Sequence, residues 1–206
     1  IDLQQEAMIP YLNGTKPVVI HVNTAKGIKQ AIEFAEKYHL KMILAEGAEA
    51  WRVADTLAKK QIPLLYALPL VNSVDDGPSK RSYDPYDVFF SAPAVLHKAG
   101  VKFAFQSGSA SIVRNLPGQV GFCCAHGLPQ EAALRAMTLG AAEILGIGDK
   151  VGSLEAGKEA DIIVTDGDPL DFTTRLRYLF IGGKPVSLES KHTRLYEKYL
   201  QRLTTK

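Results

Sequence analysis

Four short apolar runs alternate with amphipathic segments along the first half of the chain. The runs cover residues 17–22, 41–46, 62–68 and 101–106, and they are apolar almost throughout rather than at every second position. Continuous apolar runs of this length are typical of strands buried on both faces of a sheet. Because strand-like and helix-like segments alternate at short intervals, the pattern predicts parallel strands joined by right-handed crossovers.

Helical periodicity fills the intervals between these runs. Apolar positions recur every three to four residues in segments 27–40 and 49–60, as on one face of an amphipathic helix. Two further helical segments are expected at 118–127 and 129–146, the second ending at the helix breaker Gly146. The pattern therefore predicts an α/β fold with about four parallel βα units, which is half of a barrel.

The connection that follows the third apolar run is longer than the others. Its first half is polar and contains Gly77, Pro78 and Pro85, which favours a loop at the carboxyl end of that strand. In (β/α) folds this is the end at which sites are built. A solvated insertion explains the same composition equally well, and both readings stay open.

The texture of the sequence changes after the fourth βα unit. Two short strand-like runs follow, separated and flanked by glycine turns, and a final amphipathic segment predicts a surface helix. We therefore expect three parts: a partial barrel in residues 1–148, a small β element in residues 149–188, and a C-terminal helix in residues 189–206.

Composition narrows the functional classes. Apolar residues make up 46% and charged residues 22%, the balance of a globular protein, and a net charge of +2 gives no basic surface for nucleic acid. No apolar run approaches the roughly 20 residues of a membrane span. The first residue is Ile1 and the opening segment reads as the end of a helix, so we expect residues to be missing upstream. A signal peptide would be lost with them, which leaves the localisation open, with the cytoplasm slightly favoured.

Residues 127–170 contain a recognisable succession of motifs. An Ala-Leu helix is followed by a Gly-Ser-Leu-x-x-Gly-Lys-x-Ala-Asp turn, a strand and an Asp-Gly-Asp-Pro segment. This succession resembles the C-terminal signature of the amidohydrolase superfamily, in its imidazolonepropionase-like and related branches. The matching positions are Ala133, Leu134, Thr138, Ala142, Leu145, Gly146, Gly152, Ser153, Leu154, Gly157, Lys158, Ala160, Asp161, Asp166, Gly167, Asp168 and Pro169.

The resemblance implies both a fold and an activity. It implies that the four strands correspond to the fifth to eighth strands of a (β/α)8 TIM-type barrel, and that the small β element belongs to a second, sandwich-like domain. Family members hydrolyse C–N bonds, sometimes C–O or P–O bonds, with one or two divalent metals, often zinc. Their ligands are a His-x-His pair on the first strand, a histidine each on the fifth and sixth, and an aspartate on the eighth that also serves as general base.

Only part of this ligand set has a counterpart in the sequence. His21 stands in the fifth-strand position, as a metal ligand or as a structural histidine, and Glu46 stands near the sixth-strand position, as a weak oxygen ligand or as a solvated strand-end residue. The eighth strand ends in Gln106, with Ser107 and Ser109 beyond it, and these neutral groups take no proton from water near pH 7. A zinc site needs about three protein ligands, so we expect no stoichiometric zinc in this chain alone.

Three functional hypotheses follow. The first is a non-catalytic amidohydrolase-like protein with a degenerate active site, whose open strand edges predict a homo-oligomer or a complementary N-terminal half as partner. The second is an active hydrolase whose remaining ligands come from a missing N-terminal segment or a partner chain. The third is a metal-free module that binds a small molecule. Candidate pocket residues for the third are Gln106, Ser107, Ser109, Arg114 and Tyr66, with the loop at 69–87.

Overall fold

The structure is a computed structural model that describes residues 2–68 and 84–204. The helices are α1 (Leu3–Leu12), α2 (Ala25–Lys37), η1 (Ala50–Val53), α3 (Ala54–Lys59), α4 (Val88–Lys98), η2 (Val113–Asn115), α5 (Leu116–Ala125), α6 (Gln130–Met137), α7 (Leu139–Ile144) and α8 (Lys191–Thr204). The strands are β1 (Val18–Val22), β2 (Met42–Glu46), β3 (Leu64–Ala67), β4 (Phe103–Gln106), β5 (Ile162–Thr165), β6 (Leu176–Ile181) and β7 (Lys184–Pro185).

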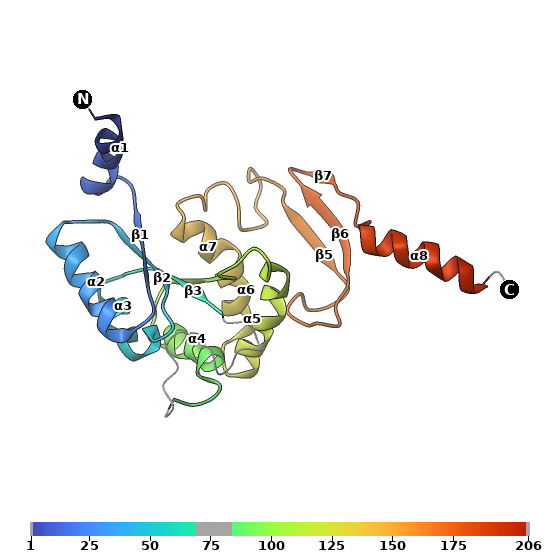
Figure 1. Cartoon of the computed structure of the whole chain (residues 1–206), viewed down its shortest axis with the longest axis horizontal. Coiled ribbons are helices and arrows are strands. Elements are labelled where there is room, and N and C mark those ends of the chain that lie inside the picture. The colour runs from blue at the N-terminus through green and yellow to red at the C-terminus, as the bar shows by residue number, and fades with distance from the viewer. Residues whose placement is uncertain (1, 69–83, 205–206) are drawn as a thin grey trace.

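The first four strands form one parallel sheet in chain order, β1-β2-β3-β4, with helices between them (Figure 1). This confirms the predicted α/β fold with four βα units. The observed strands start one or two residues later than the apolar runs. Pro17 and Pro63, which have no N–H to donate to a sheet, directly precede β1 and β3.

The main core lies between this sheet and its crossover helices. Ile20, Leu44, Leu64 and Phe103 occupy neighbouring positions on one face of the sheet and all belong to the core cluster. The helices α2, α4, α5 and α6 add apolar side chains to the same cluster. Burial of this face explains why the runs carry large aliphatic and aromatic residues, since each buried side chain stabilises the fold by about 1.5–3 kcal/mol.

The helix expected at 129–146 is wrong in one respect, because the structure has two helices there. The break falls at Thr138, whose φ of −125° and ψ of −103° are not helical. The Thr138 hydroxyl donates to the Leu134 carbonyl at 2.7 Å, a local bond that competes with the helical pattern. A Cβ on Gly140 would lie 2.9 Å from the Arg135 carbonyl oxygen, so the close approach of α7 to α6 depends on glycine.

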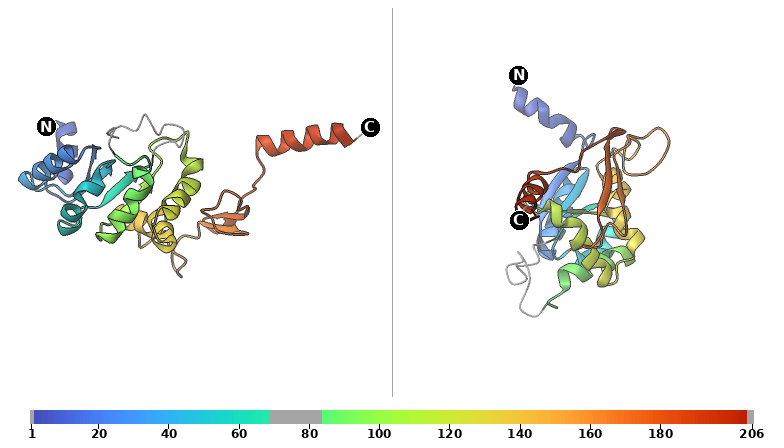
Figure 2. Two further views of the ribbon diagram at one scale, coloured as in Figure 1. Left: turned by 90° about the horizontal axis from the view of Figure 1, so that it is seen from below. Right: turned by 90° about the vertical axis from the view of Figure 1, so that its right-hand side faces the viewer.

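The C-terminal part forms a separate small sheet and an isolated helix. Strands β5, β6 and β7 pair antiparallel in that order, with an irregularity between Val164 and Thr165. Helix α8 projects from this sheet, away from the helices that surround the parallel strands (Figure 2). No helix in residues 2–68 or 84–204 is both long and apolar enough to cross a membrane.

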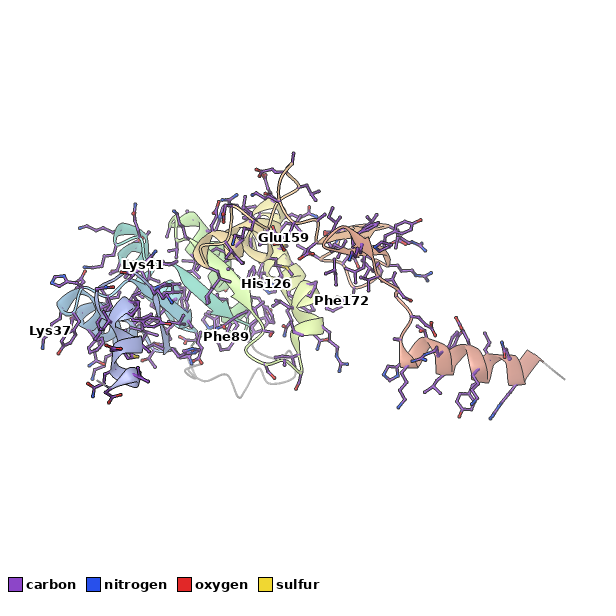
Figure 3. The ribbon with its side chains drawn as sticks, turned by 90° about the horizontal axis from the view of Figure 1, so that it is seen from above. Lys37, Lys41, Phe89, His126, Glu159 and Phe172 are labelled. Atoms are coloured by element: carbon purple, nitrogen blue, oxygen red, sulfur yellow. The ribbon has the colours of Figure 1, made fainter. Side chains whose placement is uncertain are left out.

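The segment before β6 fastens the small sheet to the parallel sheet's helices. Leu170 is buried in the main core, and Phe172 lies at the junction between α5 and the small sheet (Figure 3). Phe172 stacks on Phe122 of α5 with ring centroids 5.8 Å apart. The fit requires glycines on α5, because a Cβ on Gly118 would meet the Phe172 ring and one on Gly121 would lie 2.5 Å from the Leu170 carbonyl oxygen.

Candidate functional site

The carboxyl ends of the four parallel strands meet at one edge of the sheet, which we call the mouth. The mouth carries His21 near the end of β1, Glu46 at the end of β2, Ala67 at the end of β3 and Gln106 at the end of β4. Because all four strands run the same way, their last residues point toward the same end of the half-barrel. The strand order places His21 and Glu46 on neighbouring strands and Gln106 at the opposite edge of the sheet.

His21 and Glu46 are in direct contact. The Nδ1 atom of His21 lies 3.2 Å from Oε1 of Glu46, and the two side chains are 62% and 37% exposed. The Nδ2 atom of Asn23 donates to the other carboxylate oxygen, Oε2, at 2.5 Å. Both oxygens of Glu46 are therefore engaged by protein groups, and the carboxylate is held in place by β1 and the turn that follows it.

An unusual backbone conformation brings Glu46 to this position. Its register partner on β1 is Val22 rather than His21, but its φ of +74° takes it out of the regular strand alternation. Gly47 follows with a φ of +64°, and its N–H donates to the Val22 carbonyl at 2.9 Å. A left-handed glutamate costs of order 1 kcal/mol, which the surrounding hydrogen bonds offset.

Two residues of this cluster are not among the sequence candidates. Asn23 bonds Glu46 and also accepts from the Ala48 N–H at 3.2 Å, while Glu49 is buried and accepts from the Ala25 N–H at 2.7 Å, in the first turn of α2. A carboxylate there also suits the helix dipole. The signal for Asn23 is its place between a strand and a helix, where asparagine commonly bonds the backbone of a turn.

The residues at the end of β4 make local bonds. The Nε2 atom of Gln106 donates to the Leu65 carbonyl at 3.1 Å. The Ser107 hydroxyl donates to the Ser109 carbonyl at 3.0 Å, and the Ser109 hydroxyl accepts from the Ser111 N–H at 3.3 Å. Arg114 lies in η2 with an exposed side chain. The structure thus brings Gln106, Ser107 and Ser109 together on one turn, away from His21.

Tyr66 is a core residue, which corrects its placement among pocket-lining candidates. Its ring is fully buried and its hydroxyl donates to the Phe89 carbonyl at 3.0 Å. Burial, followed by the nearby Cys123 thiol, raises the pKa of Tyr66 well above its usual range. Its neighbours Leu64 and Leu44 also face the helices, so strand alternation directs Tyr66 away from the mouth. Residues 69–83 of the loop proposed to accompany it lie outside the described part of the chain.

The largest cavity does not coincide with the mouth. It has a volume of about 1230 Å³ and is lined by residues that precede the strands, such as Pro17, Lys41, Pro63 and Lys102, together with parts of α2, α6 and α7. None of the candidate site residues lines it. It opens at the amino ends of the strands, opposite to the end where (β/α) folds build their sites.

The donor set at the mouth does not fit a hydrolytic zinc centre. Such a centre takes about three protein ligands and leaves one position open. The mouth offers one imidazole and one carboxylate, and these already bond each other and Asn23. Within residues 2–68 and 84–204 there is no group of three or more His, Cys, Asp or Glu side chains arranged to hold a metal ion.

Comparison with known proteins decides the family. A model of the amidohydrolase family matches residues 14–188, which include both sheets. The chain belongs to the amidohydrolase family. It is also 39% identical, over 74 residues, to the amidohydrolase tasK of Hapsidospora irregularis, a match that covers 34% of this chain and 8% of that protein.

Solved amidohydrolase structures extend the likeness to nearly the whole chain. An amidohydrolase from Thermotoga maritima MSB8 superimposes with a TM-score of 0.77 at 28% identity, covering 91% of this chain and 47% of that one. An adenosine deaminase from Xanthomonas campestris with bound zinc shares the fold, with a TM-score of 0.57 at 18% identity over 93% of this chain and 52% of that one. The chain therefore spans about half the length of these structures.

This membership sharpens the question of the metal. Amidohydrolases typically use zinc or another divalent metal, and the Xanthomonas relative contains zinc. The present amidohydrolase keeps the family scaffold and one histidine at a strand end. The other donors of a zinc site are not found in the described residues.

Proposed function

We propose that this chain is a non-hydrolytic half-barrel of the amidohydrolase family, which by itself neither binds stoichiometric zinc nor cleaves C–N bonds. The observation that carries the proposal is the state of Glu46. Its two carboxylate oxygens are taken by His21 and Asn23, so the two donors nearest to a ligand position bond protein groups. The half-barrel serves as a scaffold whose mouth is closed by hydrogen bonds between side chains.

The end of β4 supports the same proposal. The resemblance to the family calls for a carboxylate here, which would bind metal and accept a proton from the attacking water. Gln106 is a neutral amide that does not act as a base near pH 7, and its amide nitrogen donates to the Leu65 carbonyl. Water bound at the mouth therefore meets no general base on β4, and we derive no hydrolytic step through a metal.

The metal content of the purified 206-residue chain tests the proposal. The protein is incubated with zinc, dialysed exhaustively against metal-free buffer, and analysed by elemental mass spectrometry. We expect far less than one zinc per chain, and the same result for His21→Ala and for His192→Ala, a matched control on the exposed helix α8.

One zinc per chain, lost in His21→Ala but kept in His192→Ala, would overturn the proposal. That result would support the second hypothesis, an active hydrolase whose remaining ligands come from another segment. A screen of amide and cyclic amide substrates would then follow, with Gln106→Asp as a variant expected to raise activity.

A further inference from the structure

Both outer strands of the parallel sheet have an unpaired edge. Val18 donates to the Lys41 carbonyl and Val22 accepts from the Gly47 N–H, so the backbone groups of these alternate residues face β2. In a parallel strand the residues between them direct both N–H and C=O the other way. Val19 and His21 therefore present their backbone groups at the open edge of β1.

The same reasoning identifies the free groups of β4. The carbonyls of Lys102 and Gln106 accept from Leu64 and Leu68, so these residues face β3. Phe103 and Phe105, which alternate with them, direct their backbone groups to the open edge. Unpaired strand edges of this kind are templates for pairing with another chain.

The face of the sheet that lies opposite the main core is apolar along most of its length. The register aligns Val19 with Ile43 on this face, and Ala45, Leu65 and Ala104 continue it across the sheet. Polar side chains appear only at the mouth, as His21 and Gln106. Val19 is 43% exposed in the middle of β1, whereas its neighbours Ile20 and Val22 pack against the core.

We propose that a second copy of this chain closes the barrel. A twofold axis along the barrel places β4 of each copy beside β1 of the other, so one operation pairs both open edges and leaves none. Four strands from each copy give eight, the number at which side chains fill a barrel interior. The size agrees, because this chain covers 47% of the Thermotoga amidohydrolase chain and two copies supply the equivalent of a whole one.

This arrangement makes the mouth a shared site. Parallel strands keep all eight carboxyl ends at one end, so the mouth contains two His21–Glu46 pairs and two Gln106 side chains. Because β1 lies beside β4 of the second copy, each His21 stands next to a Gln106 from the other chain. The inference goes beyond the proposed function, since it concerns the mass of the species and not its metal content.

The molar mass in solution, measured by light scattering after size exclusion, tests the inference. The expected mass is twice the 22.5 kDa of one chain. Val19→Pro is the decisive variant, because proline removes an N–H that faces the open edge and leaves the β1–β2 ladder intact. We expect Val19→Pro to run as a folded monomer, with the far-UV circular dichroism of a helix-rich chain.

Two further variants keep the test decisive. Val19→Asp places a charge on the inner face and gives the same monomer if the proline variant does not fold. Ile163→Lys changes a residue of β5 that is 56% exposed, and it is expected to leave the dimer intact. A monomeric wild-type chain would overturn the inference, and so would a dimer that survives both Val19 changes or is lost only in Ile163→Lys.

Discussion

At the scale of single residues, buried polar groups show how closely the half-barrel is fitted. Tyr66 is the clearest case, because its ring fills the core while its hydroxyl satisfies the carbonyl of Phe89 on α4. A buried carbonyl left without a donor costs about 1–3 kcal/mol. The hydroxyl thus connects β3 to α4 and fixes the direction of the helix that follows the third connection.

Replacing Tyr66 tests this bond. We expect Tyr66→Phe to lower the free energy of unfolding at pH 7 by about 1–3 kcal/mol, because the Phe89 carbonyl loses its donor. Tyr178→Phe, at a position 62% exposed on β6, is the matched control and should change little. Urea unfolding followed by circular dichroism measures both.

The same variant gives a signed pH dependence. Burial raises the pKa of Tyr66 in the folded chain, so above about pH 10 the unfolded tyrosine loses its proton while the folded one keeps it. Wild-type stability then falls by up to about 1.4 kcal/mol per pH unit from this group alone, until the pH passes the folded pKa. The gap between wild type and Tyr66→Phe should therefore narrow above pH 10; a constant gap would contradict the burial of an un-ionised hydroxyl.

The sequence specifies some of these residues better than others. His21 and Glu46 follow from strand ends, because the carboxyl ends of parallel strands share one edge. Their contact does not, because by register Glu46 is opposite Val22 and reaches His21 only at a φ of +74°. Tyr66 illustrates the opposite error: an apolar run shows no alternation, so the sequence does not reveal which of its residues face the helices.

At the scale of elements, two glycines on α5 decide how the chain returns to the small sheet. A Cβ on Gly121 would lie 2.5 Å from the backbone carbonyl oxygen of Leu170, which is held in the core. A Cβ on Gly118 would meet only the ring of Phe172, a side chain that is 69% exposed and free to turn aside. The two positions therefore differ in how much the neighbouring atoms can yield.

This difference predicts unequal costs for the same substitution. Gly121→Ala should lower the free energy of unfolding by about 1–3 kcal/mol, because the backbone must shift. Gly118→Ala should cost less, since the ring can move and alanine favours the helix by up to about 1 kcal/mol over glycine. Thermal unfolding of the two variants side by side measures this; equal destabilisation would mean that the strap at 170–172 is not closely packed on α5.

Periodicity predicts most of the elements but not their interruptions. The parallel strands and α2 lie where the apolar runs and the helical spacing indicate. The break at Thr138 is not visible, because the apolar positions on either side continue one stripe and helix-forming residues surround it. It depends on a tertiary fit between Gly140 and the Arg135 carbonyl, which a local pattern does not encode.

At the scale of the whole molecule, the sequence predicts half of a barrel because each βα unit carries its own signal. How the half-barrel is completed depends on chain edges and surfaces, which no local pattern specifies. Helix α8 shows the same limit: its amphipathic pattern predicts a helix, yet all residues from 191 to 202 are exposed and the helix projects from the small sheet (Figures 1 and 2). Amphipathicity alone does not say what the apolar side packs against.

Removing α8 separates its role from that of the barrel edges. A chain ending at Ser190 should keep its free energy of unfolding within about 0.5 kcal/mol, because no side chain from 191 to 202 is buried. It should also keep the mass of two copies, since the proposed contact joins β1 to β4. Urea unfolding and light scattering measure the two quantities on one sample. If the truncated chain were monomeric while Val19→Pro remained a dimer, the association would run through the exposed side chains of α8, such as Tyr196 and Tyr199, rather than through the sheet.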